Sequence, residues 1–169
     1  MKYKLYENVL NKEKFDSIKK EISSNQTPWF FNESTSVGLD NHFMFTHYLY
    51  RNNSVSSNFY FNLILPITLF ASLACQKSNL LRVKANLYTN QNKIINHAKH
   101  VDFTDLTNYK TCVFNFTSCN GGTILYVDDE EVNFPSIENS LLVFDGNIEH
   151  RGYTQTDKQR RILLNYDFD

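Results

Sequence analysis

Leu81-Arg82-Val83-Lys84-Ala85-Asn86-Leu87-Tyr88 is the stretch of this chain that decides its fold class. Apolar and polar residues alternate along it, which is the period of a half-buried β-strand. After this stretch, short runs rich in β-branched and aromatic residues are separated by turn sequences such as Asn120-Gly121-Gly122 and Asp145-Gly146-Asn147. The second half of the chain is therefore expected to consist of strands.

The same reading predicts further strands at Val101–Phe103, Thr111–Thr117, Thr123–Val127, Glu131–Phe134, Ser140–Phe144, Ile148–Gly152 and Arg161–Phe168. The acidic run Asp128-Asp129-Glu130-Glu131 lies between two of these strands and is interpreted as a hairpin turn with solvated charge. About eight short strands at near-regular spacing, preceded by helices, favour a sandwich or barrel. The predicted fold class is mainly β with N-terminal helices.

The residues before Leu80 carry helical patterns. A helix is expected over Lys12–Ser23, because Asn11 can cap it and three apolar residues recur at helical spacing: Phe15, Ile18 and Ile22. A second helix is expected from Ile64 or Pro66 to Gln76, with a buried stripe made of Leu69, Phe70 and Leu73. Residues 24–58 are interpreted as an Asn/Ser-rich loop that contains a short strand from Phe43 to Leu49.

The composition is that of one globular domain. The chain has 169 residues, of which 41% are hydrophobic and 21% charged, enough for a single substantial core. We expect one domain over residues 1–169, in which residues 1–79 support a core formed by residues 80–169. The formal net charge of −1 gives no electrostatic signal for binding to nucleic acid or an anionic membrane.

The expected location is a reducing cytoplasm. The three cysteines form no CxxC pair, and no apolar stretch follows Met1–Tyr6 as it would in a signal peptide. The apolar stretch Phe59–Cys75 is interrupted by polar residues, so it is shorter than the roughly 20 apolar residues of a membrane span. The oligomeric state is not indicated by any pattern.

His100-Val101-Asp102 and the later His150 are the residues that carry a chemical signal. Residues two apart on a strand point to the same side, so His100 and Asp102 can bind one metal ion together. His150 follows another predicted strand and turn, which can deliver a third ligand. Two imidazoles and one carboxylate without a thiolate suit non-haem Fe(II) better than structural zinc.

Each part of this pattern also has a simpler explanation. A lone HxD or a single His on a strand is usually structural, and Arg160-Arg161 alone would be a solvated basic pair. The order of the residues and the Arg after the last ligand make the combination more specific, since Arg161 can grip a carboxylate with its guanidinium. His97 and His100 form an HxxH that is a weaker alternative metal site.

With these motifs, the chain resembles the Fe(II)- and 2-oxoglutarate-dependent dioxygenase superfamily, and within it the prolyl-4-hydroxylase-like branch. Small phage and marine-bacterial members look particularly similar, and Trp29-Phe30-Phe31 matches an aromatic motif near their N-terminus. The resemblance runs from about Leu80 to Asp169. It is carried by 81–88, His100-Val101-Asp102, Thr111–Phe116, Asn120–Thr123, Leu141–Phe144, His150 and Arg161.

The resemblance implies a double-stranded β-helix, a jelly roll similar to the cupins, in which His100, Asp102 and His150 bind iron. Arg161 would hold the distal carboxylate of 2-oxoglutarate, with Arg160 as the fallback because one residue of register flips the face. The remaining co-substrate contacts implied are Tyr88, Asn115, Thr111 and Val113. Asn115 departs from the family pattern, which often has a tyrosine there.

The implied activity is hydroxylation of an amino-acid or peptidyl, prolyl-like side chain, with dioxygen consumed and succinate and carbon dioxide produced. The expected partner is therefore a small molecule or a peptide. Two other hypotheses remain at this point: a non-catalytic jelly-roll binding module, and a cupin-like metal enzyme that does not use 2-oxoglutarate. Under the cupin-like hypothesis, loss of Arg161 would leave the activity intact.

Overall fold

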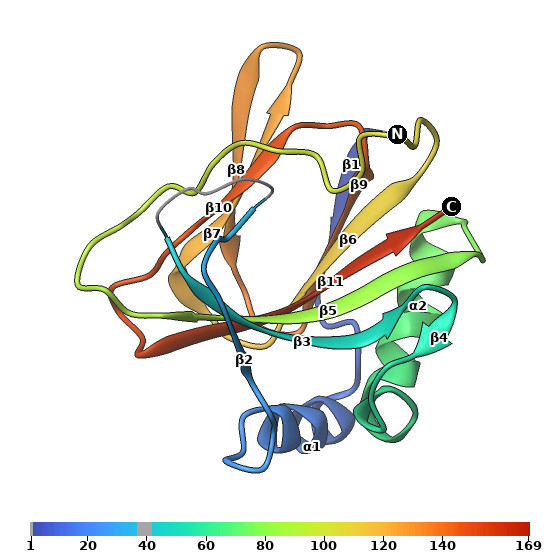
Figure 1. Ribbon diagram of the computed structural model, residues 1–169, viewed down its shortest axis with the longest axis vertical. Helices are drawn as coiled ribbons and strands as arrows, with labels where there is room; N and C mark the ends of the chain where they lie inside the picture. Colours follow the sequence, from blue (N-terminus) through green and yellow to red (C-terminus); the bar gives the residue numbers. More distant parts are fainter. Residues whose placement is uncertain (1, 37–41) are drawn as a thin grey trace.

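Two antiparallel β-sheets face each other in the computed structural model, which describes residues 2–36 and 42–169 (Figure 1). The large sheet has the order β1-β9-β6-β11-β5-β3-β2, with β4 paired to β3, and the small sheet has the order β10-β7-β8. This is the jelly-roll arrangement that the sequence predicts. Residues 37–41, part of the predicted 24–58 loop, lie outside the described residues.

The strands of the large sheet are β1 (Tyr3–Tyr6), β2 (Phe30–Asn32), β3 (Met44–Arg51), β4 (Ser54–Val55), β5 (Leu80–Thr89), β6 (Lys110–Asn115), β9 (Ser140–Asp145) and β11 (Arg160–Phe168). The strands of the small sheet are β7 (Cys119–Val127), β8 (Glu130–Ser136) and β10 (His150–Tyr153). The helical elements are α1 (Lys12–Ile22), η1 (Tyr60–Ile64) and α2 (Leu65–Cys75). The predicted hairpin turn between β7 and β8 is confirmed, with Asp128 and Asp129 at φ 53° and 66°.

Strand β5 has both faces covered, so the expectation of a half-buried strand was wrong. Val83, Ala85 and Leu87 belong to the main hydrophobic core, which also contains the inward residues of α1 and α2. Lys84 and Asn86 lie on the other face and line a cavity between the two sheets. The apolar residues of β5 therefore face the helix-covered core, and its polar residues face the cavity instead of solvent.

Helix α1 forms as predicted, because local sequence signals and packing agree. The Asn11 side chain accepts a hydrogen bond of 2.9 Å from the backbone N–H of Lys14, which caps the helix. Phe15, Ile18 and Ile22 are buried against the large sheet.

Helix α2 forms where predicted, but its buried face was predicted wrongly. Leu69 and Leu73 are 58% and 79% exposed, whereas Ile67 and Ala71 are fully buried. Apolar residues occur all round this helix, so their spacing does not select one face. The inward face is the one with small Ala71 and Cys75, which let the helix lie close to the sheet.

The predicted strand Val101–Phe103 was also wrong. Residues 101–103 lie outside the strands of the structure, and two isolated bridges, His100↔His150 and Asn96↔Tyr153, join the preceding segment to β10. Strands β1, β2 and β4 were missed because they are short and receive their order from neighbouring strands. Whether such short segments form strands depends on their pairing with neighbouring strands, and this pairing cannot be seen in the local sequence.

We predict that two truncations on α2 differ strongly in their effect on stability. Ile67→Ala removes a fully buried side chain and should lower the free energy of unfolding by about 2–5 kcal/mol. Leu73→Ala removes an exposed side chain and should change it by less than about 0.5 kcal/mol. Urea denaturation measures both, and equal losses would contradict the orientation of α2.

Candidate metal centre

The backbones of His100 and His150 are bonded to each other. His100 N–H donates to the His150 carbonyl at 3.0 Å, and His150 N–H donates to the His100 carbonyl at 2.9 Å. This pair of hydrogen bonds places the two imidazole rings side by side, with centroids 4.5 Å apart. Two residues distant in the sequence are thus brought to one point between the sheets.

Both imidazoles present the same nitrogen to this point. Nδ1 of His100 lies 3.1 Å from the Ala98 carbonyl, and Nδ1 of His150 lies 3.2 Å from the Ile148 carbonyl. A carbonyl only accepts hydrogen bonds, so each Nδ1 carries the proton and each Nε2 keeps its lone pair. Burial lowers the pKa of His150, which also favours the neutral, ligating form.

Asp102 completes a three-residue cluster. One ligand atom from each of His100, Asp102 and His150 lies within 4.8 Å of the others, and His150 Nε2 is 3.6 Å from Asp102 Oδ2. Burial acts to raise the pKa of Asp102, but the Arg82 guanidinium and other nearby cationic groups outweigh it and hold that pKa well below its usual range. The carboxylate is therefore ionised and can act as an anionic ligand.

A buried network fixes the direction of the Asp102 carboxylate. Arg82 donates to Asp102 Oδ1 at 2.6 Å and to Asp167 Oδ2 at 2.8 Å. Asn165 donates to Asp102 Oδ2 at 3.2 Å, and Thr111 donates to Asp167 Oδ1 at 2.9 Å. Because Arg82 occupies Oδ1, Oδ2 is the oxygen turned toward the two imidazoles.

Arg161 lines the cavity, and it has no carboxylate partner among the described residues. Its side chain is 1% exposed and donates to the Gly122 carbonyl at 2.9 Å and more weakly to Thr123 Oγ1 at 3.4 Å. Its Nε is buried without a hydrogen-bond partner in the described structure. A buried guanidinium in this state is costly unless a ligand supplies the anion.

Arg160, the fallback candidate, points away from the cavity. It is exposed and donates to the backbone carbonyl of Ser23 at 2.7 Å. In the antiparallel register, Arg161 lies opposite Tyr88 on β5, and the Arg161 guanidinium carbon is 5.7 Å from the centre of the Tyr88 ring.

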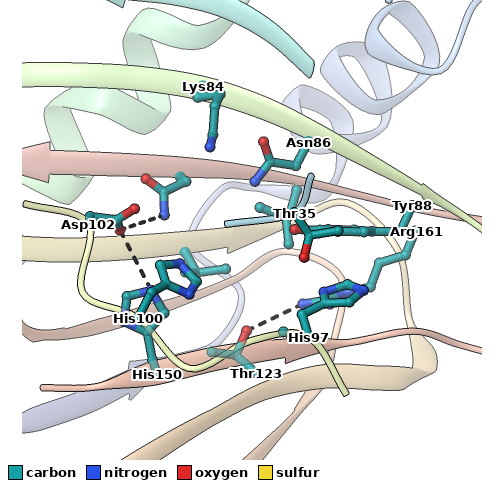
Figure 2. Close-up of a pocket in the computed structure, with 14 residues that line it drawn as sticks. Thr35, Lys84, Asn86, Tyr88, His97, His100, Asp102, Thr123, His150 and Arg161 are labelled. Atoms are coloured by element: carbon teal, nitrogen blue, oxygen red, sulfur yellow. Dashed lines mark hydrogen bonds and ion pairs between the residues drawn. The ribbon is translucent and has the colours of Figure 1, made fainter. Parts of the chain in front are cut away.

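The cavity brings most of the predicted site residues together, as Figure 2 shows. The predicted residues that line it are Tyr88, His100, Asp102, Val113, His150 and Arg161. Thr111 and Asn115 do not line it. Thr111 bonds to Asp167, and the Asn115 amide bonds to Ser136 and Ser140 behind the cavity wall.

Seven lining side chains were not predicted to be there: Thr35, Lys84, Asn86, His97, Thr123, Leu163 and Asn165. The polar alternation of β5 was the available signal for Lys84 and Asn86. His97 is outside the three-residue metal cluster and stacks on Tyr88 at 5.1 Å, so the structure does not support an HxxH metal site in the described residues. Thr35 lies in the predicted loop, where no periodic pattern could place it.

The donor set fits a ferrous ion. Two imidazoles and one carboxylate are the donor types with which non-haem Fe(II) oxygenases hold iron, so His100, His150 and Asp102 would hold such an ion. The hydrogen bonds to both Nδ1 atoms and to the Asp102 carboxylate are the kind of supporting contacts that orient metal ligands.

Several solved structures have a similar fold. A prolyl-4-hydroxylase from Pseudomonas putida superposes with a TM-score of 0.67 and 13% identity, over 98% of this chain and 91% of that one. A member of the 2OG-Fe(II) oxygenase family from Burkholderia pseudomallei gives a TM-score of 0.71 and 13% identity, over 98% and 84%. This chain has the fold of the 2OG-Fe(II) oxygenases.

The epimerase SnoN from nogalamycin biosynthesis, solved with Fe3+, alpha ketoglutarate and nogalamycin RO, has this fold too. Its TM-score is 0.66 at 12% identity, over 99% of this chain and 78% of that one. No family model matches the chain, and no curated protein does. Among the described residues, no helix has the length and apolar character needed to cross a membrane.

We predict that His100→Ala and His150→Ala each abolish tight binding of a divalent metal, because two ligands remain of three. Anaerobic titration with Fe(II), or calorimetry with Co(II) as a stable substitute, measures the affinity. A variant that binds the metal as tightly as the parent protein would remove that residue from the ligand set.

We also predict that Arg82→Met weakens metal binding by about 10- to 100-fold while all three ligands remain, because Asp102 loses the group that orients it. Arg51→Met is the control, since Arg51 is exposed and its guanidinium lies over the Tyr48 ring, without a hydrogen bond to Asp102 in the described structure. Unchanged metal affinity in Arg82→Met would show that the network does not position Asp102.

Proposed function

We propose that this protein is an Fe(II)- and 2-oxoglutarate-dependent dioxygenase that hydroxylates an amino-acid or peptidyl side chain. One observation carries the proposal: a His-Asp-His cluster with ligand atoms within 4.8 Å shares its cavity with the buried Arg161, which lacks a carboxylate partner among the described residues. A metal cluster alone fits many activities. The added cation selects a co-substrate with a carboxylate at a distance from the metal.

His100, Asp102 and His150 would hold Fe(II), and Arg161 would bind the distal carboxylate of 2-oxoglutarate. The unpartnered Nε of Arg161 and its terminal nitrogens can offer a carboxylate a two-point contact. Tyr88 and Thr123 lie beside Arg161 and form the walls on which the co-substrate would rest. Val113 adds an apolar surface to the same cavity.

Bound iron would supply the activation of dioxygen, coupled to decarboxylation of 2-oxoglutarate to succinate and carbon dioxide and to oxidation of a substrate C–H bond. The residues of this chain orient the participants. Arg82 holds Asp102, the two backbone carbonyls hold the imidazole tautomers, and Leu163 and Val113 supply apolar surface in the cavity.

A hydroxylase acting on an amino-acid or peptidyl side chain is supported by the fold shared with the Pseudomonas putida prolyl-4-hydroxylase. Fold alone does not select a substrate, so the two alternatives need their own measurement. A non-catalytic binding module would produce no succinate. A cupin-like enzyme without 2-oxoglutarate would retain its activity when Arg161 is replaced.

We predict that Arg161→Met raises the KM for 2-oxoglutarate by about 100-fold or more, because it removes a buried charge-assisted contact. Without substrate, anaerobic addition of Fe(II) and 2-oxoglutarate should give the parent protein a visible metal-to-ligand charge-transfer band that the variant lacks. Arg160→Met is the matched control and should behave as the parent protein, since Arg160 is exposed. Absence of the band in the parent protein would contradict the proposed function.

A further inference from the structure

Lys84 enters the cavity from β5 and has no fixed partner. The side chains of Lys84 and Asn86 both point from this strand into the space above the metal-binding cluster (Figure 2). No hydrogen bond or ion pair joins the Lys84 ammonium group to any described residue within bonding distance. An enclosed ammonium group that is left unpaired is uncommon, because burial disfavours its charge.

The carboxylates nearest to Lys84 are already engaged. Asp102 and Asp167 both accept hydrogen bonds from Arg82, at 2.6 and 2.8 Å. Burial lowers the pKa of Lys84 to about 8, and the positive charge of Arg82 contributes to this shift, whereas the negative charges of Asp102 and Asp167 oppose it only in part. An anion entering the cavity would therefore stabilise the ammonium form of Lys84.

Asn86 is a second polar group without a described partner. It is 5% exposed, and its carboxamide oxygen is buried without a hydrogen bond in the described structure. In Figure 2 its amide nitrogen lies on the cavity side, next to Lys84. A buried carboxamide oxygen normally accepts a hydrogen bond, so this oxygen points to a ligand group that donates one, while the amide nitrogen can donate to a ligand oxygen. Lys84 and Asn86 thus offer two donors, two residues apart on one strand face.

Arg161 and Lys84 are separate cations with separate surroundings. Arg161 lies beside Tyr88 and Thr123, whereas Lys84 lies opposite Asn165 in the β5–β11 register and on the side of Asp102. A 2-oxoglutarate molecule with one end on the metal has one free carboxylate, so it needs only one of the two cations. Arg161 is the cation proposed to bind that carboxylate. The second cation is available to the molecule that is oxidised.

We propose that Lys84 and Asn86 bind the carboxylate of the prime substrate, and that this substrate is a free amino acid rather than an internal residue of a peptide. The inference rests on the proposed dioxygenase function. An internal residue has its carboxyl group in an amide bond, so it offers Lys84 no charge. A free amino acid presents a carboxylate that both donors can reach while its side chain faces the metal-binding cluster.

The experiment uses the full chain with Fe(II) and 2-oxoglutarate and the twenty common L-amino acids, each compared with its carboxamide. We expect at least one free amino acid to stimulate succinate formation and gain one oxygen atom by mass spectrometry, while its carboxamide is inactive. Lys84→Met should raise the KM for that amino acid by about 10- to 100-fold, which is the value of a charge-assisted contact. Lys84→Arg should recover part of this loss.

Direct binding gives a second readout. Calorimetry under anaerobic conditions, with Fe(II) and 2-oxoglutarate present, should show weaker binding of the amino acid to Lys84→Met and Asn86→Leu. Lys14→Met is the control, because Lys14 is an exposed residue of α1 whose side chain makes no hydrogen bond or ion pair with the described residues. It should bind the amino acid as the parent protein does.

The outcomes separate this inference from the proposed function. Lack of any succinate and of the charge-transfer band would overturn the dioxygenase assignment itself. Succinate formation that no free amino acid stimulates, or equal use of an amino acid and its carboxamide, would overturn the role of Lys84 and leave the dioxygenase assignment intact. The same holds if Lys84→Met raises the KM for 2-oxoglutarate instead of the KM for the amino acid.

Discussion

The reciprocal backbone pair between His100 and His150 is the constraint on which the site depends. In the described structure, the segment before Asp102 is joined to β10 by two isolated bridges and not by a regular ladder. The bridge at the two histidines fixes both Cα positions at once, and the ring orientations follow from hydrogen bonds to carbonyls nearby in the chain. Asp102 then needs only a short extension of the chain to reach the same point. A regular strand is not required.

Two buried arginines show how their surroundings separate a structural role from a binding role. Arg82 is bonded to two carboxylates, so its charge is neutralised within the protein and it serves to orient Asp102. Arg161 is bonded to two backbone carbonyls, of Gly122 and Tyr153, and to the Thr123 hydroxyl, which solvate the guanidinium but do not neutralise it. Residue type and burial are similar for the two, and only the neighbouring groups tell which one awaits an anion.

The sequence was sufficient to predict most strands, helix α1 and the three residues of the His-Asp-His cluster, because alternation, caps and turn residues are local signals. It failed where long-range packing decides. On α2 the apolar residues surround the helix, so Leu69 and Leu73 were predicted as buried although the sheet contacts the opposite face. Asn115 and Thr111 alternate in phase with Val113, yet hydrogen bonds to serines and to Asp167 hold them away from the cavity. Thr35 belongs to a segment without periodicity, and only the folded chain brings it to the cavity wall.

Each histidine of the His-Asp-His cluster bonds through Nδ1 to the carbonyl two residues before it, Ala98 for His100 and Ile148 for His150. The tautomer of each histidine is therefore set within a tripeptide, 98–100 or 148–150, and does not depend on a distant side chain. Loops on either side can change in length or sequence without altering which nitrogen faces the metal. A designer could transplant each tripeptide as a unit to another antiparallel bridge, and the backbone alone would set the protonation of the ligand.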